Sequence, residues 1–135
     1  SLYNNTTGSD NTAIGQLSLY TNRANSRSTA VGVNSMYFAD NRTTGRETYN
    51  TAVGFEALRG SINPVINTGQ YNTAVGDQAL YSNTTGINNT ANGYRSLYTN
   101  ATGYNNTANG HSSLFNNTTG YSNTANGFGS LYSNA

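Results

Sequence analysis

One pentad, Asn-Thr-Ala-x-Gly, with Ser for Asn in a single copy, recurs seven times and limits what this chain can fold into. Its glycines follow at steps of 17, 22, 22, 17, 17 and 17 residues, and they are Gly15, Gly32, Gly54, Gly76, Gly93, Gly110 and Gly127. A second series runs in parallel through Leu2, Leu19, Met36, Leu58, Leu80, Leu97, Leu114 and Leu131. A fixed period of this size is typical of a solenoid, in which each repeat is one coil stacked on the next.

The residue types indicate strands and turns, because Asn, Thr, Ser and Gly are poor helix formers. Seventeen residues can hold two short strands and two turns, so we expect one strand at the pentad and a second at the segment x-x-Ser-Leu-Tyr. The predicted fold class is an all-β solenoid of seven to eight 17-residue coils, two of them extended to 22, stacked at about 4.8 Å. A third series, Gly8, Asn25, Gly45, Gly69, Gly86, Gly103 and Gly120, predicts a turn with positive φ, since Asn is the next-best residue after Gly there.

Side-chain alternation along a strand predicts which residues fill the coil. Ala74 and Leu80 are expected inside. The expected outward residues are Thr73, Val75, Ala79, Tyr81, Ser96 and Tyr98. A core of little more than one Ala and one Leu per coil is thin, and only 34% of the chain is hydrophobic. We therefore expect a homo-oligomer to supply the missing burial; the alternative is a monomer held by backbone and Asn or Thr side-chain ladders.

The pentads resemble the Ser-Val-Ala-Ile-Gly pentads of the YadA-like head repeats of trimeric autotransporter adhesins, and the phrase NTAVGxxALYSNTTG is similar to repeats of related trimeric bacterial or phage-type fibre proteins. The matching segments are Asn11–Gly15, Ser28–Gly32, Asn50–Gly54 and Asn72–Gly76, with variants at Asn89–Gly93, Asn106–Gly110 and Asn123–Gly127. The resemblance implies a left-handed parallel β-roll packed as a homotrimer around a common axis.

Two features depart from the YadA-like pattern. The period of this chain is longer. The apolar position of the pentad, filled by Ile14, Val31, Val53 and Val75, becomes Asn92, Asn109 and Asn126. If that position faces a trimer axis, the axis turns from apolar to polar along the rod; otherwise the position is half-exposed and accepts either kind of residue.

The composition offers little for catalysis or metal binding. The chain has no Cys and a single His, His111, at a position that varies between coils. Its five acids lack the spacing of a calcium loop. Six Arg, no Lys and a net charge of +1 argue against nucleic acid as a partner, and no run of 18 apolar residues exists that could span a membrane. We expect a protein that is not an enzyme and has no cofactor.

The candidate binding site lies in the two longer coils, whose extra residues form insertion loops at about 37–47 and 59–68. Both loops follow the Leu segment, so on stacked coils they are expected to lie side by side, and functional residues of repeat proteins concentrate in such loops. The predicted ligand-binding residues are Tyr37, Phe38, Asp40, Arg42, Arg46, Glu47, Arg59, Ile62, Asn63, Val65 and Ile66. The alternative is that these loops cover a neighbouring protomer and seal the trimer.

The chain is thus interpreted as a single head or tip domain, residues 1–135, excised from a longer fibre. Its expected function is adhesion to a glycan or protein on another cell, at the surface of an outer-membrane-anchored fibre or on a virion tail fibre. The alternatives are a structural spacer without a ligand and an ice-binding solenoid, which would use the regular series of threonines.

Overall fold

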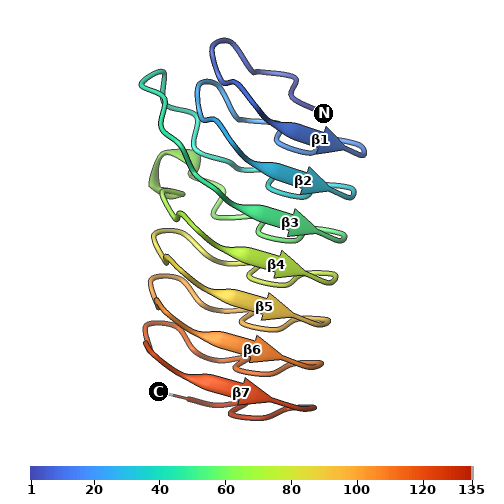
Figure 1. Ribbon diagram of the computed structural model, residues 1–135, viewed down its shortest axis with the longest axis vertical. Helices are drawn as coiled ribbons and strands as arrows, with labels where there is room; N and C mark the ends of the chain where they lie inside the picture. The colour runs from blue at the N-terminus through green and yellow to red at the C-terminus, as the bar shows by residue number, and fades with distance from the viewer. Residues whose placement is uncertain (135) are drawn as a thin grey trace.

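The computed structural model describes residues 1–134, in which seven stacked coils each give one three-residue strand to a single parallel sheet (Figure 1). The strands are β1 (Thr12–Ile14), β2 (Thr29–Val31), β3 (Thr51–Val53), β4 (Thr73–Val75), β5 (Thr90–Asn92), β6 (Thr107–Asn109) and β7 (Thr124–Asn126). Their order in the sheet is the order in the sequence. The predicted parallel all-β solenoid is confirmed; Ala135, the last residue of the predicted domain, lies outside the described part.

The register shows why the pentad repeats. The three residues of each strand, Thr, Ala and the fourth residue of the pentad, pair with the same positions of the next strand, and the two longer coils leave this register unchanged. Ala74 is fully buried whereas Thr73 and Val75 are exposed, as alternation predicted. Val75 lies opposite Asn92, so the exposed aliphatic column of β1 to β4 continues as a column of amides in β5 to β7. We call this side of the sheet the outer face.

The second strand predicted in each coil is wrong. Within the described residues the Ser-Leu-Tyr segments form consecutive turns, and the leucine itself takes the left-handed conformation, with φ of 50° at Leu97. A left-handed residue interrupts the extended backbone that a strand requires. Hydrogen bonds between coils nevertheless continue on this side, from the Leu80 amide to the Ser96 carbonyl at 3.0 Å and from the Ser82 amide to the Tyr98 carbonyl at 3.1 Å.

The positive φ predicted for the third series of glycines is also wrong. It occurs instead at the pentad glycines, such as Gly76 with φ of 128°. Glycine is needed in the third series for lack of space, because a Cβ on Gly86 would lie 2.5 Å from the Gly103 carbonyl oxygen of the next coil. Asn25 fits at this position with its side chain buried, where its amide donates to the Asp40 carbonyl at 2.8 Å.

The coil interior is fuller than predicted. Ala79 and Ser96, expected to point outward, are completely buried, because the turns at this segment do not alternate as a strand would. Buried asparagines fill much of the rest, and they are Asn22, Asn25, Asn50, Asn72, Asn83, Asn89, Asn100, Asn106 and Asn117. Their amides connect successive coils; the side chain of Asn89, for example, donates to Asn72 Oδ1 at 3.1 Å. Since a buried amide with its hydrogen bonds made is not costly, the thin apolar core alone does not require an oligomer.

Candidate functional site

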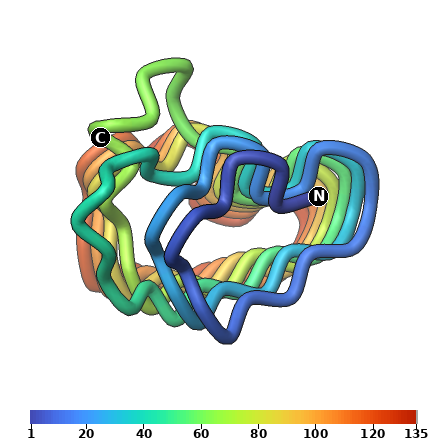
Figure 2. Tube along the Cα trace, turned by 90° about the horizontal axis from the view of Figure 1, so that it is seen from above, coloured from blue at the N-terminus to red at the C-terminus, as the bar shows by residue number. Residues whose placement is uncertain are grey.

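The two insertion loops lie in contact, and two side chains join them. Arg46 of the first loop donates from Nη1 to the Thr68 carbonyl at 2.5 Å and from Nη2 to the Asn67 carbonyl at 3.3 Å. In the opposite direction, Asn67 Nδ2 donates to the Phe38 carbonyl at 2.5 Å. Seen along the solenoid, the segment 59–68, drawn in green, projects beyond the outline of the coils on the side away from the strands (Figure 2).

Asp40 organises the first loop from inside. Its side chain is only 1% exposed, and it accepts hydrogen bonds from the backbone and guanidinium of Arg42 and from Arg46 Nε at 3.2 Å. The hydrogen bond to Asp40 raises the pKa of Arg42. Burial lowers the pKa of Arg46, and the nearby Asp40 charge opposes this effect. Because the carboxylate is buried and already bound by two guanidinium groups, Asp40 holds the loop in place rather than facing a ligand.

Asn67 closes the second loop. Its side chain pairs with the backbone of Ser61, accepting from the Ser61 amide at 3.0 Å and donating to the Ser61 carbonyl at 2.9 Å. Between them lies one 3₁₀ turn, η1 (Pro64–Ile66). Gly60 has φ of 82° and passes so close to Asn67 that a Cβ would lie 2.6 Å from its Nδ2 atom. The proline, the turn and this side-chain pair therefore fix the loop in one shape.

The fixed loop exposes aliphatic side chains. Ile62 is 78% exposed, Val65 46% and Ile66 41%; we call these three residues the apolar tip. Asn63 is exposed between them. Of the first loop, Arg42 contributes a side chain that is 44% exposed. These five predicted site residues are exposed on the two insertion loops.

Three other predicted site residues belong to a column of stacked rings along the rod. Tyr37 stacks on Tyr20 with ring centroids 5.1 Å apart, and its edge meets Phe38 at 4.5 Å. The guanidinium of Arg59 lies 4.7 Å from the Phe38 ring and 5.1 Å from the Tyr81 ring. Arg59 therefore takes the place that Tyr or Phe occupies in all the other coils, directly after the leucine or methionine. Aligning the repeats of the sequence shows that Arg replaces the ring in this one coil.

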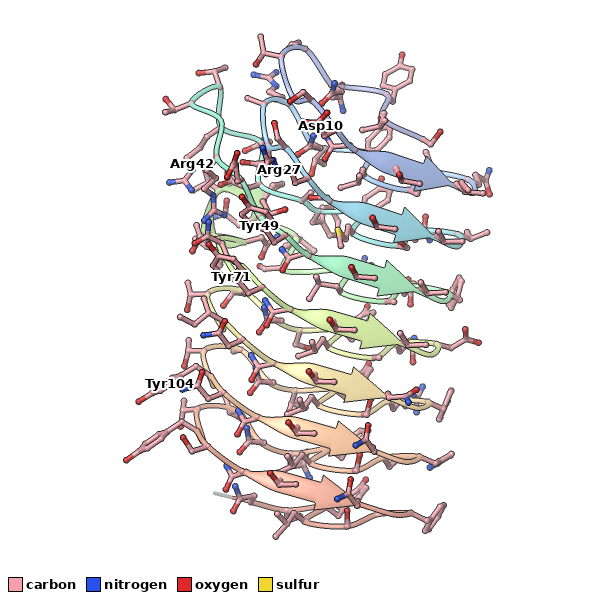
Figure 3. The ribbon with its side chains drawn as sticks, viewed as in Figure 1. Asp10, Arg27, Arg42, Tyr49, Tyr71 and Tyr104 are labelled. Atoms are coloured by element: carbon pink, nitrogen blue, oxygen red, sulfur yellow. The ribbon has the colours of Figure 1, made fainter. Side chains whose placement is uncertain are left out.

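Glu47 lies apart from the tip, on the edge where the strands begin. It forms an ion pair with Arg27 at 3.2 Å and accepts a hydrogen bond from the Tyr49 hydroxyl, which raises the pKa of Tyr49. Tyr49 in turn stacks on Tyr71 at 5.2 Å. Figure 3 shows Arg27, Tyr49 and Tyr71 on this edge, with Arg42 near them. The predicted site thus separates into buried supports, members of the ring column, exposed loop residues and Glu47, which forms a separate surface ion pair.

The single histidine, His111, belongs to another column of rings. His111 is exposed and lies between the rings of Tyr94 and Phe128, at 4.9 and 5.0 Å. Among residues 1–134, no three His, Cys, Asp or Glu side chains come together as metal ligands. The same part of the chain has no helix with the length and apolar character needed to cross a membrane. What the loops offer chemically is an exposed aliphatic surface on the second loop and an exposed guanidinium group on the first.

Comparison with models of protein families, with curated proteins and with solved structures gives no match for this chain.

Proposed function

We propose that this chain is the adhesive head of a trimeric surface fibre, a left-handed β-roll that binds a cell-surface ligand through its insertion loops. The observation that carries the proposal is that two apolar surfaces lie on opposite sides of the solenoid. One is the aliphatic column of the outer face; the other is the apolar tip. The first suits contact between copies of the chain, and the second is then free to meet a partner outside the fibre.

The aliphatic column consists of Ile14, Val31, Val53 and Val75, one residue per coil. Ile14 is 61% exposed in the single chain, and Val53 and Val75 are exposed by more than a third. A regular exposed apolar strip of this kind is characteristic of a protein–protein contact. The resemblance of the pentads to trimeric fibre heads supports three copies around one axis. The amide column of Asn92, Asn109 and Asn126 would extend that axis as a polar segment.

The segment 59–68, which carries the apolar tip, projects away from the strands (Figure 2), so three copies would present three tips outward. Weak single contacts would then add up through avidity. The Phe38 ring meets Tyr37 edge-on and carries the Arg59 guanidinium on its face, so the exposed surface of the tip is aliphatic rather than aromatic. This favours a protein ligand over a glycan.

The trimer is tested by sedimentation. At micromolar concentration the protein is expected to sediment with three times the 14.3-kDa mass of one chain. Val53→Asp together with Val75→Asp should shift it to monomers, because like charges would face each other across the interface. Thr102→Asp together with Thr119→Asp is the matched control, because these two exposed residues of neighbouring coils lie outside the strands. A folded wild-type monomer at this concentration would contradict the proposal.

Binding is tested on the tip alone. Ile62→Ser, Val65→Ser and Ile66→Ser together keep Asn67 and Ser61 in place, so the loop should retain its shape while losing its apolar surface. Fluorescently labelled protein is expected to lose most of its binding to cultured epithelial cells, with the trimer intact. Ile87→Ser, which removes a similarly exposed aliphatic residue elsewhere, should have no effect. Unchanged binding by the triple variant would refute the role of the tip, and collapse of the trimer would instead assign the loops to packing.

A second candidate function, ice binding, is favoured by one observation. The threonines at the first strand position are in register over all seven strands, because the insertions lie on the other side of the coil. They are Thr12, Thr29, Thr51, Thr73, Thr90, Thr107 and Thr124. Thermal hysteresis of the purified protein separates this function from adhesion, and a fibre spacer would show neither hysteresis nor cell binding.

A further inference from the structure

The regular coils contain a series of buried amides in which each side chain satisfies the next. Asn100 Nδ2 donates to Asn83 Oδ1 at 3.0 Å, and Asn117 Nδ2 donates to Asn100 Oδ1 at 3.0 Å. The same contact joins Asn22 to Asn5 at the other end of the rod, at 2.9 Å. Each oxygen in the series therefore depends on an amide from the following coil.

The series is broken in the two extended coils. Counted from the leucine of each coil, Ala39 and Ser61 stand at the position that asparagine fills elsewhere. Asn22 Oδ1 is consequently left buried and accepts no hydrogen bond from any residue between 1 and 134. Asn25 Oδ1 is in the same situation, since its amide donates to the Asp40 carbonyl while its oxygen has no donor among the described residues. A buried polar atom without a partner is destabilising.

Both asparagines line a cavity of about 40 Å³ inside the extended coils. Its wall also includes Phe38, Asp40 and Asn67, so it lies directly beneath the two insertion loops. About 10–15 Å³ in this measure is enough for one water molecule. The cavity therefore has room for roughly two or three.

The chemistry of the wall decides between water and a metal ion. Asp40 is the one carboxylate among the lining residues, and it is bound by Arg42 and Arg46, which leaves this group of three with a net positive charge. A cation would be repelled there. The unpartnered atoms are both acceptors, so an anion could not satisfy them either. A small neutral donor of hydrogen bonds fits both conditions.

We propose that this cavity is a binding site for two or three water molecules, which donate hydrogen bonds to Asn22 Oδ1 and Asn25 Oδ1 and form the floor of both insertion loops. The site is independent of the trimer and of any ligand at the tip. In the extended coils, these water molecules make the hydrogen bonds that asparagine amides make in the regular coils.

A matched pair of variants at Ala39 tests the proposal. Ala39→Asn restores the missing amide, which can donate to Asn22 Oδ1 and take the place of a water molecule, so its melting temperature should equal or exceed that of the wild type. Ala39→Val is closer to asparagine in size than leucine is and has no donor; by displacing water it should melt at least about 3 °C below Ala39→Asn. If the valine variant is as stable as the asparagine variant, the site is a dry void and the proposal is overturned.

Crystallography supplies an independent measurement. A structure at better than about 1.5 Å should show water within hydrogen-bonding distance of Asn22 Oδ1 and Asn25 Oδ1. In crystals grown with thallium acetate, the cavity should give no anomalous peak. A thallium peak at these oxygens would show that a monovalent cation binds there instead of water, and this would overturn the proposal. A lack of density next to both oxygens would overturn it as well.

Discussion

Leu97→Asp is expected to unfold the rod at neutral pH. Leu97 is completely buried between the coils before and after it, and its neighbours in the core are the corresponding leucines and the pentad alanines. A carboxylate there would lose its hydration with no cation in reach, at a cost of about 4–5 kcal/mol or more. Backbone strain does not add to this effect, because Asp accepts the left-handed φ of 50° at this position better than Leu does. Urea unfolding followed by circular dichroism measures the loss.

Two controls separate charge from shape in this experiment. Leu97→Asn has the same size as the Asp variant and no charge, so the difference between them isolates ionisation. Burial raises the pKa of the new carboxyl above its unfolded value of about 3.9, so the folded state binds the proton more tightly. The penalty should therefore be small near pH 3.5 and grow as the pH rises through the folded pKa.

Tyr98→Ser tests the face assignment. Tyr98 is half-buried and stacks on Tyr81 and Phe115 at 5.0 Å each, so its loss should cost only about 1–2 kcal/mol. If Tyr98→Ser destabilises the rod as much as Leu97→Asp, the column of stacked leucines is not the core of the coil.

The repeat predicts the solenoid because its periodicity does not depend on the local backbone conformation within each coil. Seven copies of one pentad at steps of 17 or 22 residues leave stacked coils as the simple arrangement, and alternation within Thr-Ala-Val is enough to place Ala74 inside and Val75 outside. The same alternation fails at Ala79 and Ser96, because it assumes a strand where the leucine adopts a left-handed turn. Leucine is not a residue from which positive φ is expected, so no pattern in the sequence indicates this turn.

The place of the candidate site follows from the same periodicity, whereas the roles of its residues do not. Two neighbouring coils with extra residues after the leucine must carry adjacent loops, and Arg46 does reach Thr68. The sequence shows the charge of Asp40 but not its burial, and therefore predicts that Asp40 faces a partner. The charge of Arg59 leads to the same prediction, although its position after Leu58 is that of the stacked rings. Composition thus locates the loops, and only the packing separates supports from surface.

Asp40→Ala is expected to release both insertion loops while leaving the coils stacked. The substitution removes the carboxylate that binds Arg42 and Arg46 and leaves the half-buried Arg46 guanidinium without its ion pair. Breaking a buried ion pair by removing one partner costs about 3–5 kcal/mol. Because Arg46 also joins the first loop to the Thr68 carbonyl, the loss should appear as faster hydrogen exchange in both segments, 37–47 and 59–68. The strand amides of β5 to β7, which lie several coils away, should exchange as in the wild type.

Two further variants decide whether the buried charge is the cause. Asp10→Ala is the matched control, because Asp10 is exposed and its carboxylate accepts a hydrogen bond from the Ser9 hydroxyl at 3.3 Å; its effect should stay within about 0.5 kcal/mol. Asp40→Ala combined with Arg46→Met removes both charges of the more buried pair and leaves unpaired only the Arg42 guanidinium, which is 44% exposed and can be hydrated, so the double variant should recover much of the lost stability. The link from Arg46 to Thr68 is absent in that variant, so the second loop should still exchange faster than in the wild type. If Asp40→Ala is no more harmful than Asp10→Ala, the buried carboxylate does not hold the loops, and the rigidity of the apolar tip must come from Asn67 and Pro64 alone.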